Sequence, residues 1–303
     1  MRIAVTGATG LIGHALYQQL FGHEHQFILL ARNPEEAQSR FSGARIVQWE
    51  AAAGPPPKEP LEGVEVVVHL AGESIAAGRW TEARKRAIRT SRIEGTRNLV
   101  KGLSCLASPP RVLVSGSAVG YYGDRGNELL DESSRPGSGF LADVCRQWER
   151  EALEATRLGI RVVLLRTGIV LSARGGALAQ MLPPFKMFLG GSLGSGRQWM
   201  SWIHLEDEVE LILTAIRNES VEGPLNATSP HPRTNKEFSK SLGKVLRRPA
   251  FMPVPGFALR MLMGEMAQCL LLEGQRVLPK KAGQIGFQFK HPRLESALRN
   301  LIE

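Results

Sequence analysis

The sequence lacks several features that would place it in a special class of protein. No apolar run reaches the length needed to cross a membrane. The first residues, MRIAVTGATG, are typical of a strand and a turn and contain no hydrophobic stretch of a signal peptide. The three cysteines, Cys105, Cys145 and Cys269, lie far apart and fit neither a metal site nor a disulfide framework. These absences predict a globular protein of the cytoplasm, with no metal and no membrane partner.

Acidic side chains are also in short supply, with 29 Asp and Glu against 38 Lys and Arg and a formal net charge of +9. Nucleic-acid binding would require the basic residues to cluster on one element of a known binding module. Here they are scattered along the chain. A small anionic ligand, such as a phosphorylated cofactor, needs only a few of them. We therefore expect no nucleic-acid partner and a small anionic or polar substrate.

Short apolar runs alternate with helical stretches through the first 170 residues. Expected strands cover 2–5, 27–31, 45–49, 64–71, 111–118 and 160–168, and expected helices cover 11–21, 80–103 and 140–157. This alternation predicts an α/β fold of the Rossmann type, with a doubly wound parallel sheet covered on both faces. We assign residues 1–172 to this domain, with 200–220 returning to it. Residues 173–303 are expected to form a smaller, mainly helical substrate lobe over the carboxyl edge of the sheet.

The segment TGATGLIG, residues 6–13, joins the first expected strand to the first expected helix. Gly7 permits a tight turn, Gly10 lets the backbone approach a pyrophosphate, and Gly13 lets the helix pack close to the strand. Free N–H groups and the positive end of the helix dipole would then face the phosphates. Because the loop lies between a strand and a helix, the pattern predicts a dinucleotide site and not an ordinary glycine-rich turn.

The end of the second strand indicates which dinucleotide is bound. NAD sites usually place Asp or Glu there, whereas this chain has Arg32, nineteen positions after Gly13. A guanidinium fork suits the extra phosphate of NADP(H), although Arg32 could also be an ordinary surface arginine. The next strand ends in HLAGE, 69–73, whose small residues would let the backbone lie along the cofactor ribose.

Several motifs in a fixed order carry a resemblance to a known family. TGATGLIG, HLAG, RIEGTRNLV (92–100), VSGSAVGYYG (114–123), RTGIVL (166–171) and WIHLEDE (202–208) occur in that order. As a set they resemble the extended short-chain dehydrogenase/reductase superfamily, of the NAD(P)-dependent epimerase/dehydratase type. The tail GQRVLPKKAGQIGFQFKHPRLESAL, 274–298, is similar to that of a poorly characterised branch with a C-terminal domain of unknown function. Some members of that branch carry the label cell-division-inhibitor-like.

The resemblance implies NADP(H) as cofactor and a C-terminal lobe that binds substrate. It also implies a monomer or a homodimer, since relatives often dimerise through helices equivalent to 80–103 and 140–157. The predicted cofactor contacts are Gly7, Thr9, Gly10, Leu11, Ile12, Gly13, Arg32, Leu70, Ala71, Gly72, Glu73, Arg92, Ser115 and Arg166.

The chain departs from the family in its acid–base residues. Relatives use Tyr-x-x-x-Lys, in which the lysine lowers the pKa of the tyrosine that moves the proton. This chain has three tyrosines, Tyr17, Tyr121 and Tyr122, and none has a lysine four residues later. In the stretch FLADVCRQWE, 140–149, the tyrosine slot holds Phe140 or Leu141, and the lysine slot holds Val144 or Cys145.

Two further positions differ from relatives. On the long helix, Lys85 and Arg92 share a stripe with Ile88, Gly95, Leu99 and Leu103, so each needs either an anionic partner or a route past the stripe to solvent. Met200 stands where sugar-nucleotide epimerases have an arginine that holds the nucleotide diphosphate, although Arg197 could compensate. A nucleotide-sugar substrate is therefore disfavoured.

The catalytic candidates are Ser117, Tyr121, Tyr122 and Glu73. Ser117 matches the serine that polarises the substrate oxygen in relatives, and its alternative is a turn serine that bonds the backbone. Either tyrosine could reach the nicotinamide or could pack under the lobe. Glu73 could act as a base or serve as a cap or surface charge. We interpret His204 as a hydrogen-bonded packing residue.

Two hypotheses follow from this pattern. The first is an NADP(H)-dependent oxidoreductase or sugar-epimerase-like enzyme that moves its proton without a Tyr–Lys pair. The alternative is a non-catalytic NADP(H)-binding sensor or scaffold, since the cofactor half is complete while the acid–base pair is missing.

Overall fold

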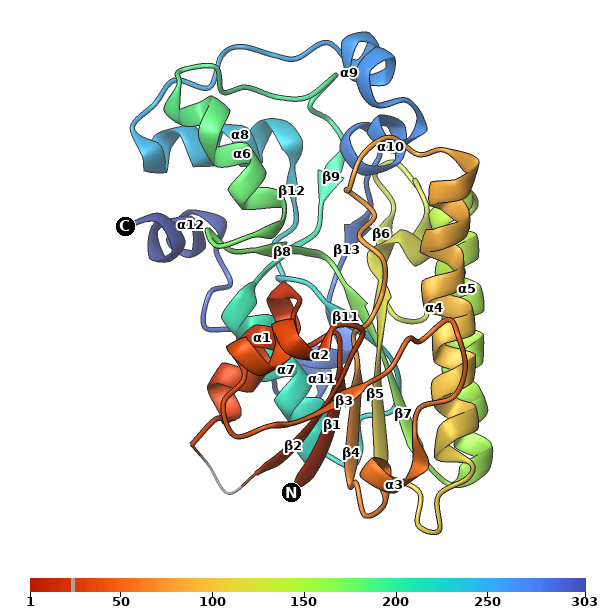
Figure 1. Ribbon diagram of the computed structural model, residues 1–303. Helices are drawn as coiled ribbons and strands as arrows, with labels where there is room; N and C mark the ends of the chain where they lie inside the picture. The colour runs from red at the N-terminus through yellow and green to blue at the C-terminus, as the bar shows by residue number, and fades with distance from the viewer. Residues whose placement is uncertain (23–24) are drawn as a thin grey trace.

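Seven parallel strands form the central sheet of the computed structural model, which describes residues 1–22 and 25–303 (Figure 1). Their spatial order is β11-β7-β5-β4-β1-β2-β3, so the chain winds outward from β1 in both directions. The strands are β1 Arg2–Thr6, β2 Gln26–Ala31, β3 Arg45–Gln48, β4 Val66–His69, β5 Val112–Ala118, β7 Arg161–Thr167 and β11 Gly223–Ala227. The expected doubly wound, Rossmann-type sheet is confirmed.

Helices cover both faces of the sheet. One face packs against α1 Leu11–Leu20 and α7 Leu205–Arg217, through residues such as Leu16 and Ile212. The other face packs against α4 Glu82–Leu103 and α5 Phe140–Leu153, which lie side by side (Figure 1). The short helices α2 Pro34–Arg40, α3 Lys58–Leu61 and η2 Glu154–Leu158 complete these layers. Burial on both faces explains the continuously apolar strands.

The long helix α4 begins and packs as its sequence indicates. The Thr81 side chain caps its first turn by accepting a hydrogen bond from the Arg84 N–H at 3.1 Å. Ile88, Leu99 and Leu103 on the predicted stripe are fully buried. Full burial of each such side chain contributes about 1.5–3 kcal/mol. The stripe therefore fixes the rotation of the helix and decides which of its charged residues face the interior.

A second group of elements forms the lobe above the carboxyl edge of the sheet (Figure 1). Its core contains Trp202, Phe238 and Leu298 and is separate from the two cores that cover the sheet. The lobe elements are β8 Ile169–Leu171, α6 Gly176–Lys186, β9 Trp199–Met200, β10 Trp202–His204, β12 Arg233–Thr234, α8 Asn235–Leu246, α9 Gly256–Met263, α10 Glu265–Ala267, η3 Gln268–Leu272, β13 Arg276–Val277 and α12 Leu294–Ile302.

The chain crosses between sheet and lobe more than once. After the lobe segment ending at β10, α7 and β11 return to the sheet, and α11 Lys280–Gln284 later packs beside β11. The short strand β6 Leu129–Leu130 in turn pairs with β13. Sheet and lobe thus each draw on residues from both sides of the boundary expected at 172–173. Within the described residues, no helix combines the length and the hydrophobicity required to cross a bilayer.

Candidate active site

The phosphate loop has the geometry that its glycines predict. Gly7 has a φ of +72°, and a Cβ there would lie 2.7 Å from the carbonyl carbon and oxygen of Leu70. A Cβ on Gly13 would lie 2.5 Å from the Gly7 oxygen. Gly10 is the N-cap of α1 and offers no side chain to bond the first turn, so N–H groups of that turn stay available to a ligand. The loop and the helix dipole together suit a pyrophosphate.

A buried hydrogen-bond network that the sequence did not reveal fixes the neighbouring loop 70–73. The Thr6 Oγ1 lies 2.7 Å from the His69 Nδ1 and accepts from the Ala71 N–H at 3.1 Å. The His69 Nε2 lies 2.9 Å from the Thr96 Oγ1 on α4. Burial lowers the pKa of His69 to about 4, so its ring is neutral at pH 7. The histidine of the HLAG motif thus ties β1, β4 and α4 together behind the predicted ribose contacts.

Arg32 and Glu73 meet at the end of β2. The Arg32 Nη1 lies 3.2 Å from the Glu73 Oε2, and the Arg84 Nη1 lies 3.1 Å from the other carboxylate oxygen. Partial burial raises the pKa of Glu73, but the hydrogen bond from Arg84 and the charge of Arg32 outweigh it and lower that pKa overall. A carboxylate held ionised by two arginines is a weak base, which argues against Glu73 as the catalytic base.

Arg92 lies beneath the 70–73 loop and beside the position where relatives have lysine. Its Nη1 donates to the main-chain oxygens of Glu73 at 2.9 Å and Ile88 at 3.3 Å. Its guanidinium lies 5.2 Å from the centre of the Trp148 ring. Lys85, the other cation of the stripe, instead pairs with Glu82 and Glu265. Lys85 therefore takes the ion-pair alternative, and Arg92 supports the loop on which the cofactor contacts are predicted.

The dyad slots contain no group that could exchange a proton near neutral pH. Leu141 packs against Gly120, and Phe140 packs edge-on against Trp80 with ring centres 5.2 Å apart. Burial raises the pKa of Cys145 to about 12, so its thiol stays protonated. Cys145 is therefore a buried packing residue and not a carrier of the proton.

Ser117 on β5 belongs to a buried network that also includes Glu149 on α5, Arg166 on β7 and, through Tyr122, Asn226 on β11. Its hydroxyl donates to the Glu149 carboxylate at 2.6 Å. Arg166 on β7 donates to both oxygens of the same carboxylate at 2.8 Å, and the two side chains are only 3% and 6% exposed. A buried bidentate pair of this kind is strong only when its remaining bonds are satisfied, as they are here. Glu149 was not a sequence candidate, because no motif pairs it with Arg166.

The two neighbouring tyrosines have different surroundings. Tyr122 is fully buried, accepts from Arg166 at 2.9 Å and donates to the Asn226 Oδ1 at 2.7 Å. Burial raises its pKa to about 12. Tyr121 is only partly buried and stacks on the Arg166 guanidinium, 3.5 Å from the ring centre. Of the two predicted tyrosines, Tyr121 is the more accessible to a ligand.

Some predicted cofactor contacts already have internal partners. The three donor nitrogens of Arg166 bond Glu149 and Tyr122, so a direct cofactor contact would require it to leave them. Ser115 is fully buried. Thr9 and Gly10 are exposed, and Leu11 and Ile12 are partly exposed, at the mouth of the phosphate loop. Thr9 and Gly10 of the loop, together with Arg32 and Gly72, are therefore the exposed residues among the predicted contacts.

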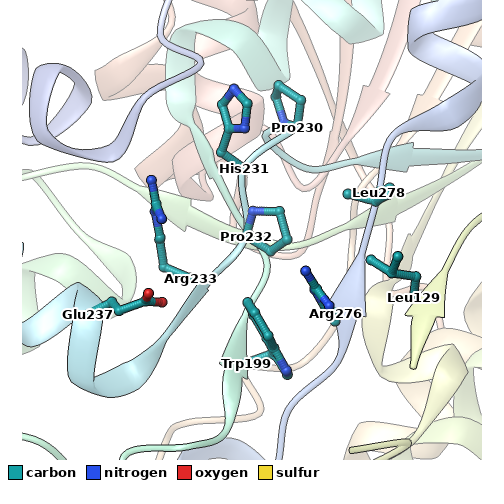
Figure 2. Close-up of a pocket in the computed structure, with 9 residues that line it drawn as sticks. All are labelled: Leu129, Trp199, Pro230, His231, Pro232, Arg233, Glu237, Arg276 and Leu278. Atoms are coloured by element: carbon teal, nitrogen blue, oxygen red, sulfur yellow. The ribbon is translucent and has the colours of Figure 1, made fainter. Parts of the chain in front are cut away.

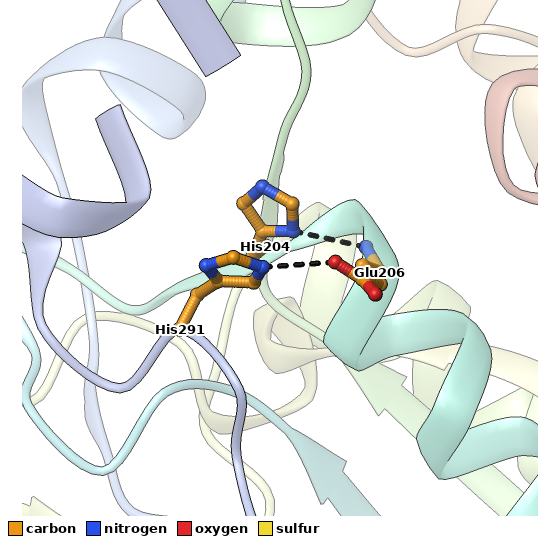
Figure 3. A group of neighbouring side chains, drawn as sticks. All are labelled: His204, Glu206 and His291. Carbon is orange, nitrogen blue, oxygen red and sulfur yellow. Dashed lines mark hydrogen bonds and ion pairs between the residues drawn. The ribbon is translucent and has the colours of Figure 1, made fainter. Parts of the chain in front are cut away.

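His204 belongs to a joint between the lobe and the sheet (Figure 3). Its Nδ1 accepts from the Glu206 N–H at 3.1 Å, which caps α7, and its ring stacks on His291 with centres 3.8 Å apart. The His291 Nε2 lies 2.9 Å from the Glu206 carboxylate. These three side chains are close enough to surround a metal ion. However, the helix cap already uses the Nδ1 lone pair of His204, and this arrangement favours the packing role predicted from the sequence.

Met200, which stands where relatives have an arginine, is buried in the lobe core. Arg197 is exposed to solvent.

Comparison with known proteins gives matches over the whole chain. Residues 3–227 match the NAD dependent epimerase/dehydratase family, and residues 254–301 match a domain of unknown function, DUF1731. An Arabidopsis thaliana protein, "Epimerase family protein SDR39U1 homolog, chloroplastic", is 44% identical over 100% of this chain and 87% of its own length. The Bacillus subtilis epimerase family protein YfhF is 40% identical over 100% of this chain and 98% of its own length.

Solved structures agree with these matches. Human epimerase family protein SDR39U1, crystallised with NADPH, superposes with a TM-score of 0.88 at 35% identity, over 99% of both chains. The UDP-glucuronic acid 4-epimerase of Bacillus cereus superposes with a TM-score of 0.80 over 99% of this chain and 98% of its own, but at 16% identity. The second likeness concerns the fold alone.

Proposed function

The chain belongs to the NAD dependent epimerase/dehydratase family, and we propose that it is an NADP(H)-dependent oxidoreductase or epimerase-type enzyme that works without a Tyr–Lys pair. The observation that carries this proposal is the glycine loop at the N-terminus of α1, with Arg32 beside it at the end of β2. Backbone N–H groups suit the pyrophosphate, and the arginine suits the additional phosphate. The NADPH in the crystals of human SDR39U1 supports the choice of cofactor.

Arg32 is well placed to discriminate between the two cofactors. Its side chain is 68% exposed, and its one ion pair among the described residues is with Glu73. An exposed pair of this kind contributes only about 0–1 kcal/mol, so it can be exchanged for a phosphate. Arg84 would then keep Glu73 neutralised through its own ion pair.

Ser117 is the group that we propose at the reacting end. The cofactor supplies or accepts the hydride when bound. Because the Ser117 hydroxyl donates its hydrogen bond to Glu149, both of its oxygen lone pairs are free to accept from a substrate hydroxyl. Arg166 donates to both oxygens of the Glu149 carboxylate and so holds that carboxylate in place as the acceptor for the serine hydroxyl. Ser117 and Glu149 would thus orient a substrate oxygen, and Tyr121 would border it.

The cofactor half of the proposal is tested by titration calorimetry with NADPH and NADH. We expect Arg32→Gln to weaken NADPH binding about tenfold or more, which is about 1.4 kcal/mol, and to leave NADH binding unchanged. Arg40→Gln removes the same charge from a surface pair on the nearby α2 and is the matched control. Absence of heat with both NADPH and NADP⁺ in the folded wild type would refute the cofactor assignment.

The catalytic half is tested by following NADPH absorbance in both directions, with NADPH and a panel of carbonyl compounds and with NADP⁺ and a panel of alcohols and sugar nucleotides. We expect turnover with at least one compound and its loss in Ser117→Ala, with NADPH affinity retained. Tight NADPH binding with no turnover on any compound would favour the non-catalytic sensor or scaffold. The cytoplasmic location and the monomeric or homodimeric state of the protein remain predictions.

A further inference from the structure

A second candidate site lies in the lobe, where strands β9, β12 and β13 meet. A cavity of about 470 Å³ opens there, bordered by Trp199, His231, Arg233, Glu237 and Arg276 (Figure 2). None of these residues belongs to the glycine loop or to the network around Ser117. Two of the five side chains are arginines, one is a histidine and one is a glutamate.

Arg276 is a partly buried cation that forms no ion pair within residues 1–22 and 25–303, and the carboxylate nearest to it in charge interaction is Glu237. Its guanidinium stacks on the Trp199 ring, 4.4 Å from the ring centre. Its Nε is shielded from solvent and, among the residues that the structure describes, has no hydrogen-bond acceptor. Leaving a buried donor of a charged group unsatisfied costs about 1–3 kcal/mol or more. A group held at that cost is typical of a site that a ligand completes.

The surrounding contacts hold Arg276 in position. The Trp199 Nε1 donates to the Asn127 side chain at 2.9 Å, which fixes the ring beneath the guanidinium. The main chain on either side of Arg276 is bonded to Ser201, whose hydroxyl donates to the Gln275 oxygen at 2.7 Å and accepts from the Val277 N–H at 2.9 Å. The arginine is therefore positioned before any ligand arrives, which lowers the entropy lost on binding.

The other charged groups leave the cavity positive. Arg233 makes no ion pair within residues 1–22 and 25–303. Glu237 closes the capping box of α8, because its carboxylate accepts from the Thr234 N–H and hydroxyl at 2.9 Å. A neighbouring cavity of about 850 Å³ shares His231, Arg233 and Glu237 and adds the cations Lys240, Lys244 and Arg293 and the carboxylate of Glu295, which pairs with Lys244. An anion would thus meet several basic side chains and two carboxylates that are already engaged.

We propose that this cavity binds the phosphoryl group of a small anionic ligand, through the guanidinium groups of Arg276 and Arg233. A guanidinium fork matches the geometry of phosphate oxygens better than an ammonium does, and the partial burial of Arg276 strengthens the bond. The proposal goes beyond the proposed function and does not depend on it, because the residues involved are different.

Titration calorimetry with sodium pyrophosphate tests the proposal. NADP⁺ is present at saturation so that the glycine loop is filled, and a parallel titration without NADP⁺ covers the case in which that cofactor does not bind. We expect Arg276→Gln to weaken pyrophosphate binding about tenfold, and Arg276→Lys, which keeps the charge but loses the fork, to weaken it less. Arg157→Gln removes an equal charge from a surface pair on η2 and is expected to bind as the wild type does.

The Trp199 ring provides a second readout. Because it lies against Arg276, pyrophosphate is expected to change tryptophan fluorescence in the wild type and not in Trp199→Phe. Equal pyrophosphate affinity in the wild type and Arg276→Gln, or no binding at millimolar pyrophosphate, overturns the proposal. NADPH affinity is expected to be unchanged in Arg276→Gln, so failure of this site and failure of the cofactor site are separate results.

Discussion

Two parts of the carboxyl edge of the sheet, one at β1 and one at β5 and β7, are built in different ways. At β1 the groups proposed to bind the ligand are backbone N–H groups of a continuous loop, and side chains are excluded by Gly7 and Gly13. At β5 and β7 the groups proposed to bind the ligand are side chains, and Ser117 is oriented by Glu149 and Arg166 from other elements. Ligand binding at β1 should therefore depend on the shape of the backbone more than on the chemistry of side chains. Ligand binding at β5 and β7 should depend on the chemistry of the side chains more than on the shape of the backbone.

Breaking the buried pair has the largest expected effect. Glu149→Gln leaves Arg166 with an uncompensated charge in a site that is almost fully buried, which costs about 3–5 kcal/mol of folding stability. Urea unfolding measures the loss. Glu151→Gln on the same helix breaks a half-exposed pair with Arg97 and is expected to cost less than about 1 kcal/mol. Equal losses in the two variants would show that the buried Glu149–Arg166 pair costs no more to break than the half-exposed Glu151–Arg97 pair.

Adding one methyl group to the glycine loop comes next. In Gly7→Ala the new carbon meets the Leu70 backbone at 2.7 Å, so we expect NADPH affinity to fall about 100-fold, or about 2.7 kcal/mol. Gly159→Ala is the matched control, since that glycine has a similar φ of +75° and open space around it. The control should lose about 1–2 kcal/mol of stability to backbone strain and no NADPH affinity. Unchanged calorimetric affinity in Gly7→Ala would contradict the assigned geometry.

These outcomes bear on how much could be predicted from the sequence. The glycine loop is one continuous motif, so both its fold and its ligand could be predicted without knowing any distant contact. The network around Ser117 could not be predicted, because Glu149 and Tyr122 reach it from separate elements and Tyr122 bonds Asn226, more than one hundred residues away. The stripe on α4 was predicted correctly, but the partners of Lys85 and Arg92 depend on tertiary packing.

The pH dependence of stability that comes from Glu208, next to β7, is expected to be smaller for each pH unit than the effects of the two substitutions above. Burial raises the pKa of Glu208 to about 8, and its only bond among the described residues is with the Thr167 hydroxyl. Folding therefore binds a proton between pH 4.5 and 8, so this group's contribution to stability is full below pH 4.5 and is lost as the pH rises. Glu208→Gln does not titrate. Its stability relative to the wild type should rise by up to about 1.4 kcal/mol per pH unit across that window.

Denaturant unfolding at pH 5, 6.5 and 8.5 measures the Glu208 effect. The histidines with lowered pKa, His69 and His204, titrate in the same window but are present in both proteins. Their contributions therefore cancel in the difference. A constant difference between Glu208→Gln and the wild type at all three pH values would mean that Glu208 is ionised in the folded protein.

The smallest effect on NADPH affinity is expected from Glu73, the carboxylate that pairs with Arg32. Glu73→Gln removes the carboxylate that competes with a phosphate for Arg32, so NADPH affinity should rise about two- to fivefold. Glu128→Gln, which breaks a surface pair with Arg125, is the control and should leave NADPH affinity unchanged. A fall in affinity would instead indicate that Glu73 itself bonds the cofactor, as the sequence also allowed.

The bond between Asn226 and the tail limits how the tail can vary. The Asn226 Nδ2 donates to the main-chain oxygen of Leu278 at 3.0 Å, within the segment that matches the domain of unknown function. A carbonyl oxygen is present whatever residue occupies position 278. This bond therefore places no restriction on the side chain at position 278, but an insertion or deletion that shifts the path of the chain would break it.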